Sequence, residues 1–146
     1  MKRVAAALAI GAIGLVGLTA NNAPDPEKLS PRMNYVLHCQ GCHLPDGSGM
    51  KGKVPDMRGE LGLFARLPEG RDYIGRVPGA ANAHLSDAQL ARVLNWLVLE
   101  MGPAGAGPFK PYSAEEVGRL RRDRLQKVRA IRESLLAQTR PARRTR

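Results

Sequence analysis

Both cysteines of this 146-residue chain fall within five residues, Cys39-Gln40-Gly41-Cys42-His43. Two sulfurs three residues apart on a helical turn can reach both vinyl groups on one edge of a porphyrin, and the next residue then directs its imidazole to the iron. The spacing therefore predicts one covalently attached haem, held by Cys39 and Cys42, with His43 as an iron ligand. Covalent attachment also offsets the small apolar core that a short chain can build.

Three other readings of the cysteine pair account for less of the motif. A zinc half-site needs further ligands at paired spacing, and only His38 and His84 remain in the sequence. A redox-active dithiol gives no reason for His43, and neither does a disulfide formed in an oxidising compartment. Haem attachment is the reading that uses all three residues.

The residues after His43 extend the pattern. They are Leu44-Pro45-Asp46-Gly47-Ser48-Gly49, followed by Val54-Pro55-Asp56-Met57-Arg58-Gly59. Over about residues 30 to 101 the sequence resembles the class I cytochrome c family, with its pattern C-x-x-C-H-x-x-D-G-x-G and a proline-containing loop. The resemblance implies an all-α domain, with three to four helices around one covalent haem c, and electron transfer rather than catalysis.

The resemblance also implies a role for Pro55. In the family, the carbonyl of the matching proline accepts a hydrogen bond from the proximal imidazole, which orients the ring and raises its donor strength. Val54 stands where the family has glycine. Pro55 is therefore expected to contact His43, with an ordinary loop proline as the alternative.

The sixth iron ligand is the main departure from the family. That ligand is usually a methionine in the loop before the last helix, where this chain has Val77-Pro78-Gly79-Ala80-Ala81-Asn82-Ala83-His84. His84 and Met57 are the candidate replacements, with Met50 a third. Met57 matches a packing leucine of the family, and His84 also reads as a surface histidine. An open or weakly held sixth position is the other alternative, and it would favour a haem enzyme or a gas-binding protein.

Two helices are expected to frame the haem motif. Ser30-Pro31 is an N-cap followed by proline at the first helical position. Ser86 and Gln89 form a capping box before a helix that Gly102-Pro103 ends. Its apolar residues recur at three- and four-residue steps: Leu90, Val93, Leu94, Leu97, Val98 and Met101. Tyr35 and Trp96 are candidate partners where the two helices cross, and a short middle helix is expected within residues 64–77.

The N-terminus reads as an export signal over residues 1–23. Lys2 and Arg3 precede a fifteen-residue run without charge, Val4 to Leu18. A helix needs about 20 apolar residues to span a bilayer, so the run suits a signal peptide better than a membrane segment. The mature chain is therefore expected in the periplasm, with an uncleaved N-terminal anchor as the alternative.

The basic character of the chain lies in its C-terminal part. Residues 24–103, the expected cytochrome domain, carry nine Lys and Arg and nine acidic residues. Residues 104–146 carry twelve Lys and Arg against four acidic residues. A Gly/Pro linker is expected at 104–112, because small residues and prolines do not propagate a helix.

Residues 113–146 are expected to form a basic amphipathic helix and tail. Ser113 and Glu116 suggest another capping box, and apolar residues mark one face to about Gln138, with Arg124 as an interruption. The preferred placement of this helix is on its own domain, with a partner helix or a membrane surface as alternatives. The positive face would then steer an acidic redox partner, whereas nucleic acid is implausible for an exported haem protein.

The functional prediction is a periplasmic electron carrier. It would shuttle electrons between a donor, for example a dehydrogenase, and a respiratory acceptor, with no substrate chemically transformed. A haem subunit fixed in a larger redox complex is a further alternative.

Overall fold

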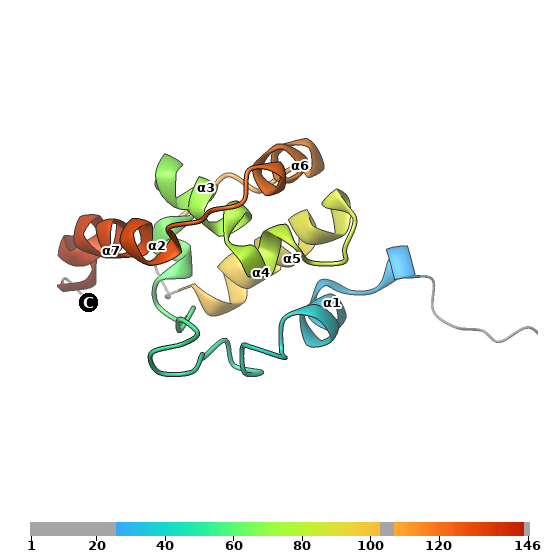
Figure 1. The fold of residues 1–146 in the computed structure, drawn as a ribbon, viewed down its shortest axis with the longest axis horizontal. Helices are drawn as coiled ribbons and strands as arrows, with labels where there is room; N and C mark the ends of the chain where they lie inside the picture. The colour runs from blue at the N-terminus through green and yellow to red at the C-terminus, as the bar shows by residue number, and fades with distance from the viewer. Residues whose placement is uncertain (1–25, 103–106, 145–146) are drawn as a thin grey trace, which may run out of the picture.

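The computed structural model describes residues 26–102 and 107–144, and these residues form helices and one isolated β bridge, Met50 to Val54 (Figure 1). The predicted all-α fold is confirmed. The elements are the 3-10 turn η1 (Pro26–Lys28) and helices α1 (Pro31–His38), α2 (Leu61–Phe64), α3 (Pro68–Arg76), α4 (Pro78–Ala81), α5 (Asp87–Met101), α6 (Ala114–Arg122) and α7 (Val128–Arg144). The predicted signal peptide, 1–23, lies outside the described residues.

Helices α1 and α5 pack against each other, as the sequence predicts. Tyr35 of α1 is fully buried, and its ring lies 5.5 Å from that of Trp96 of α5, centroid to centroid. Val93, Leu94 and Leu97 of α5 complete the apolar surface behind them. This pair of helices supports the turn that carries the two cysteines.

The predicted helix starts are confirmed at both helices. The Ser30 hydroxyl accepts a hydrogen bond from the Met33 amide at 3.2 Å. At α5, the Ser86 hydroxyl accepts from the Gln89 amide, and the Gln89 side chain accepts from the Ser86 amide at 2.8 Å. These bonds satisfy backbone donors that a helix leaves without partners at its N-terminus.

The middle helix is present as α3, and two single-turn helices that the sequence did not predict flank it. The four-residue helices α2 and α4 give too little periodicity to be recognised from sequence. Gly70 lets α3 approach α2 closely, since a Cβ atom there would lie 2.2 Å from the carbonyl oxygen of Phe64. In Figure 1, α2, α3 and α4 lie above the loop formed by residues 40–60.

The C-terminal part forms two helices rather than the single one predicted to about Gln138. Helix α6 ends at Arg122, residues 123–127 form a bend, and α7 then begins. The bend falls at the polar interruption that Arg124 makes in the apolar pattern. The Leu125 amide donates to the carbonyl of Arg76 at 2.9 Å, which fixes the bend to α3.

Both C-terminal helices dock on their own domain. The apolar core of the molecule includes four residues from this part of the chain: Tyr112, Val117, Leu125 and Leu135. The capping box expected at Ser113 is half formed. Ser113 accepts from the Glu116 amide, but the Glu116 carboxylate pairs with Arg71 of α3 at 2.8 Å. The ion pair with a distant helix thus takes the place of the hydrogen bond that the Glu116 side chain would make in a capping box.

Candidate haem site

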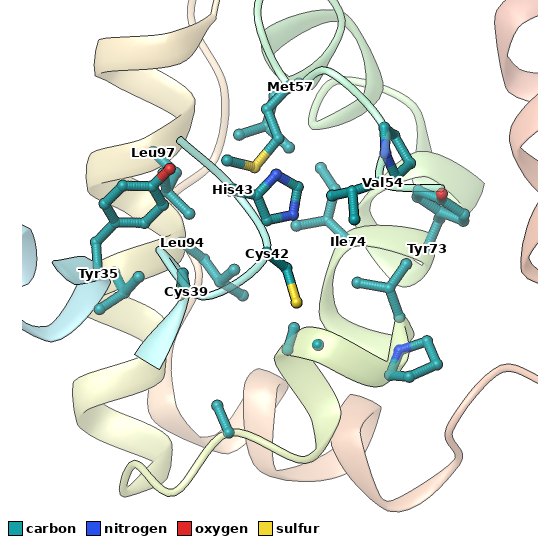
Figure 2. Close-up of a pocket in the computed structure, with 18 of the residues that line it drawn as sticks. Tyr35, Cys39, Cys42, His43, Val54, Met57, Tyr73, Ile74, Leu94 and Leu97 are labelled. Atoms are coloured by element: carbon teal, nitrogen blue, oxygen red, sulfur yellow. The ribbon is translucent and has the colours of Figure 1, made fainter. Parts of the chain in front are cut away.

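A cavity of about 380 Å³ lies between the loop of residues 39–57 and helices α3, α4 and α5 (Figure 2). Its size falls in the range of about 300–1,000 Å³ typical of ligand pockets. Most of its lining is apolar, and much of it comes from Leu90, Val93, Leu94 and Leu97 of α5. The cavity is therefore suited to a large apolar group.

The cysteine motif forms one wall of this cavity. Cys39 closes α1, because its amide donates to the Tyr35 carbonyl at 2.9 Å. The amides of Cys42 and His43 both donate to the Cys39 carbonyl, at 3.1 and 2.9 Å. This tight turn brings both cysteines, which are free thiols, and the His43 imidazole to the same cavity. The structure thus unites the three residues that the sequence singled out.

The environment of His43 suits coordination of a metal, and that of Cys39 keeps its sulfur protonated. Burial lowers the pKa of His43, although the negative charge of Asp56 opposes the shift. A neutral imidazole is the form that coordinates iron. The pKa of Cys39 is raised to about 11, mainly by burial and to a smaller extent by the charge of the neighbouring Cys42. This thiol therefore keeps its proton at neutral pH.

The predicted hydrogen bond between His43 and Pro55 is not formed. The Nδ1 atom of His43 is buried without a hydrogen-bond partner, and Pro55 lines the cavity. An unpaired buried ring nitrogen costs free energy. The two thiols and the His43 imidazole all line the cavity from the same turn, and that arrangement fits one bound group. The supporting role of Pro55 stays a prediction.

Several contacts hold the loop that follows the motif. The Tyr35 hydroxyl donates to the Leu44 carbonyl at 2.6 Å. Arg58 bridges two carboxylates, those of Asp46 at 2.7 Å and Asp56 at 2.6 Å. Because these ion pairs are half exposed, they contribute little to stability and serve mainly to fix the conformation of the loop. The loop is thereby tied to α1 at one end and closed on itself at the other.

Gly49 is required where the loop folds back on itself. A Cβ atom at Gly49 would lie 2.1 Å from the carbonyl oxygen of Val54 and 2.5 Å from that of Pro55. Gly47 has a φ of 81°, a conformation that side chains disfavour. These two glycines thus allow one part of the loop to pass close to the backbone of another.

Of the three candidates for the sixth iron ligand, one lines the cavity and two do not. His84 is exposed and is not among the residues that line the cavity. Met50 is also exposed and away from it. Met57 lines the cavity, is partly buried, and its thioether points toward the His43 ring in Figure 2. The structure therefore does not bring His84 or Met50 to the site.

Sequence reasoning missed one part of the site. Val128 and Arg132 of α7 line the cavity, and the Arg132 guanidinium pairs with the carboxylate of Glu60, which also lines it. These residues are remote from the cysteine motif in sequence. The amphipathic pattern of the tail predicted an apolar face, but nothing in it indicated which cavity that face would meet.

The chain belongs to the c-type cytochrome family. Two proteins named cytochrome c-552, both from Thermus thermophilus, are each 31% identical to it over 118 aligned residues. The alignment covers 66% of this chain, and 90% of one relative and 80% of the other. No family model matches the chain, and no solved structure does. Family membership implies a covalently bound haem c, which agrees with the cavity and the free thiols beside it.

Proposed function

We propose that the protein is a periplasmic electron carrier with one haem, bound through Cys39 and Cys42 and ligated by His43. The observation that carries the proposal is the meeting of the two thiols and the neutral imidazole in one apolar cavity. The bound group supplies a reversible one-electron change at its iron. The chain supplies attachment, the axial imidazole and an apolar surround.

The rim of the cavity supports outer-sphere transfer. Cys42, Lys53, Pro55 and Gly79 all line the cavity and are exposed. A group attached at Cys42 would therefore present an edge at the protein surface. An electron can pass through such an edge without a substrate entering the site.

Localisation is part of this proposal. Residues 1–23 carry the signal pattern, and a periplasmic machinery that joins haem to cysteine thiols would meet the chain after export. Within residues 26–102 and 107–144, no helix is long and apolar enough to cross a bilayer.

The attachment test uses the full chain expressed with and without a cytochrome c maturation system. Haem should remain on the protein after acid-acetone extraction, with an alkaline pyridine spectrum typical of two thioether links. Cys39→Ser and Cys42→Ser should each shift that spectrum toward one link, and the double variant should lose the haem to extraction. Extractable haem in the wild-type protein would refute the proposal.

A positive patch beside the cavity supports an acidic redox partner. Val128 and Arg132 place the start of α7 at the cavity, and Lys127 and Arg129 are exposed on either side of Val128. Clustered positive charge accelerates encounter with a negative partner, and salt weakens that effect. The partner is thus proposed to dock near the exposed edge.

Charge reversal at this patch tests the docking proposal. Lys127→Glu and Arg129→Glu together should slow electron exchange with an acidic redox protein at low salt, by tenfold or more, and flatten the salt dependence. Arg122→Glu and Arg140→Glu together, at exposed positions of α6 and further along α7, form the control with the same change in net charge. Equal slowing by both changes would indicate that net charge, rather than this patch, sets the rate.

A further inference from the structure

Among the described residues, one lysine and one arginine line the cavity, and their surroundings differ. Lys53 belongs to the loop after the cysteine motif and is exposed. Arg132 belongs to the first turns of α7, and its side chain is only 23% exposed. Burial of a charge beside an apolar cavity costs free energy unless partners compensate it. The position of Arg132 therefore needs an explanation.

Glu60 accounts for part of this placement. Its carboxylate pairs with the Arg132 guanidinium, and its own side chain is 18% exposed and lines the cavity. The contact runs from one terminal nitrogen of Arg132 to one oxygen of Glu60. A guanidinium has five N–H donors in a planar fork, so this contact leaves several of them available to a second acceptor. Glu60 thus fixes the direction of the Arg132 side chain without using all its donors.

Tyr73 of α3 lies within reach of the same two charges. Burial raises the pKa of its phenol, the positive charge of Arg132 opposes the shift, and the negative charge of Glu60 adds to it. Tyr73 lines the cavity, is 7% exposed, and its hydroxyl makes no hydrogen bond to any described residue. A buried tyrosine hydroxyl usually has a partner. Tyr73 and Arg132 thus bring a neutral donor and a charged donor to one part of the cavity.

The cysteine motif and this pair of donors lie at different ends of the cavity. Cys39 caps α1, which packs on α5, whereas α7 packs on α2 and α3. Figure 1 shows α1 at one end of the loop of residues 40–60 and α7, beside α2, at the other. In Figure 2 the His43 ring separates Tyr73 from Cys39. The cavity therefore extends from the thiols toward Tyr73 and Arg132.

Haem has its vinyl groups and its propionates on opposite edges. Thioether links to Cys39 and Cys42 would hold the vinyl edge at the turn that carries them. The propionate edge then faces the other end of the cavity, where most of the lining is apolar. A carboxylate in such a setting needs charge-assisted hydrogen bonds, and the guanidinium fork matches its two oxygens.

We infer that Arg132 and the Tyr73 hydroxyl bind a propionate carboxylate of the attached haem, and that Glu60 positions the Arg132 guanidinium for this contact. The inference rests on haem attachment as proposed above. Arg132 lies outside residues 30–101, the range that resembles class I cytochrome c. Helix α7 thus completes the cofactor site from beyond the family domain. Its positive charge also favours the reduced iron and so raises the reduction potential.

The test is resonance Raman spectroscopy of the haem-loaded full chain, because the propionate bending band reports hydrogen bonds to the propionates. Arg132→Gln and Tyr73→Phe should each move this band to lower frequency, and Arg132→Gln should also lower the reduction potential. Lys53→Gln, which removes the exposed cation of the cavity, should shift the band less than Arg132→Gln. Arg129→Gln, at an exposed position of α7 outside the cavity, should leave the band unchanged.

Glu60→Gln separates loss of the donor from displacement of α7. This change breaks the same ion pair but keeps the guanidinium, so it should shift the band less than Arg132→Gln does. Equal shifts in these two variants, or an unmoved band in Arg132→Gln, would overturn the inference. An unmoved band in Tyr73→Phe alone would remove Tyr73 from the site.

Arg132→Lys serves if Arg132→Gln yields too little folded protein. It keeps the charge but not the fork, so it should shift the band while largely preserving the reduction potential. A wild-type band in Arg132→Lys would show that the fork makes no contact with a propionate. Failure of haem attachment is separate, because it appears in the extraction test before any spectrum is recorded.

Discussion

Removal of Arg121 should destabilise the protein far more than removal of its exposed neighbours. The Arg121 side chain is 18% exposed and donates to three carbonyls and to the Asp87 carboxylate. Hydrogen bonds to charged groups contribute about 1.5–3 kcal/mol each. The bonds share one guanidinium and Asp87 is 44% exposed, so they do not add fully. We expect Arg121→Ala to cost about 3 kcal/mol.

Thermal and denaturant unfolding of the haem-loaded protein measure this cost. For a chain of this size, about 3 kcal/mol corresponds to a fall in Tm of roughly 6–12 °C. Arg121→Lys should fall between wild type and alanine, because an ammonium cannot reproduce the guanidinium fork. Arg122→Ala, at an exposed site on the same helix, should change stability by less than about 0.5 kcal/mol. A loss of stability in Arg121→Ala no greater than in Arg122→Ala would show that the hydrogen bonds of Arg121 do not stabilise the fold.

Three further predictions follow from packing. Gly49→Ala should disturb the loop that carries Pro55 and lower the yield of haem-loaded protein severalfold, whereas Gly41→Ala, with nothing within 4 Å of the added carbon, should cost much less. Asn34 is fully buried with both amide atoms unpaired, so Asn34→Leu should raise the free energy of unfolding by about 1–3 kcal/mol in denaturant titrations. Truncation after Gly102 removes four core side chains, each of which contributes about 1.5–3 kcal/mol to the free energy of unfolding. The truncated protein should therefore show no cooperative unfolding transition by circular dichroism. A truncated protein that stays folded and loses only partner binding would contradict this prediction.

The site residues that can be predicted from the sequence are those that lie close together in it. Cys39, Cys42 and His43 occupy one turn, so their spacing alone determines that they meet. The capping residues Ser30 and Ser86 act over three positions, and their helices begin where expected. Such signals depend on backbone geometry within a few residues and need no knowledge of the tertiary fold.

Contacts between distant segments could not be predicted in the same way. Glu116 satisfies a capping-box pattern, but its carboxylate gains more from Arg71, whose side chain is only 13% exposed. The placement of Arg132 at the cavity depends on the bend at residues 123–127, and that bend depends on a backbone bond to α3. A sequence pattern specifies the apolar face of a helix, but the partner of that face follows from packing of the whole chain.

The arginines of the C-terminal helices divide into two sets with different physical roles. Arg121 and Arg132 point inward, are largely covered, and bind carbonyls or a carboxylate of the haem domain. Arg129 and the neighbouring Lys127 are exposed where α7 meets the cavity. Neutralising the inward set should therefore change stability with little effect on the salt dependence of electron exchange, and reversing the outward set should do the opposite. The basic composition of the tail thus serves the integrity of the site, and under the proposed function its exposed part also serves the approach of an acidic partner.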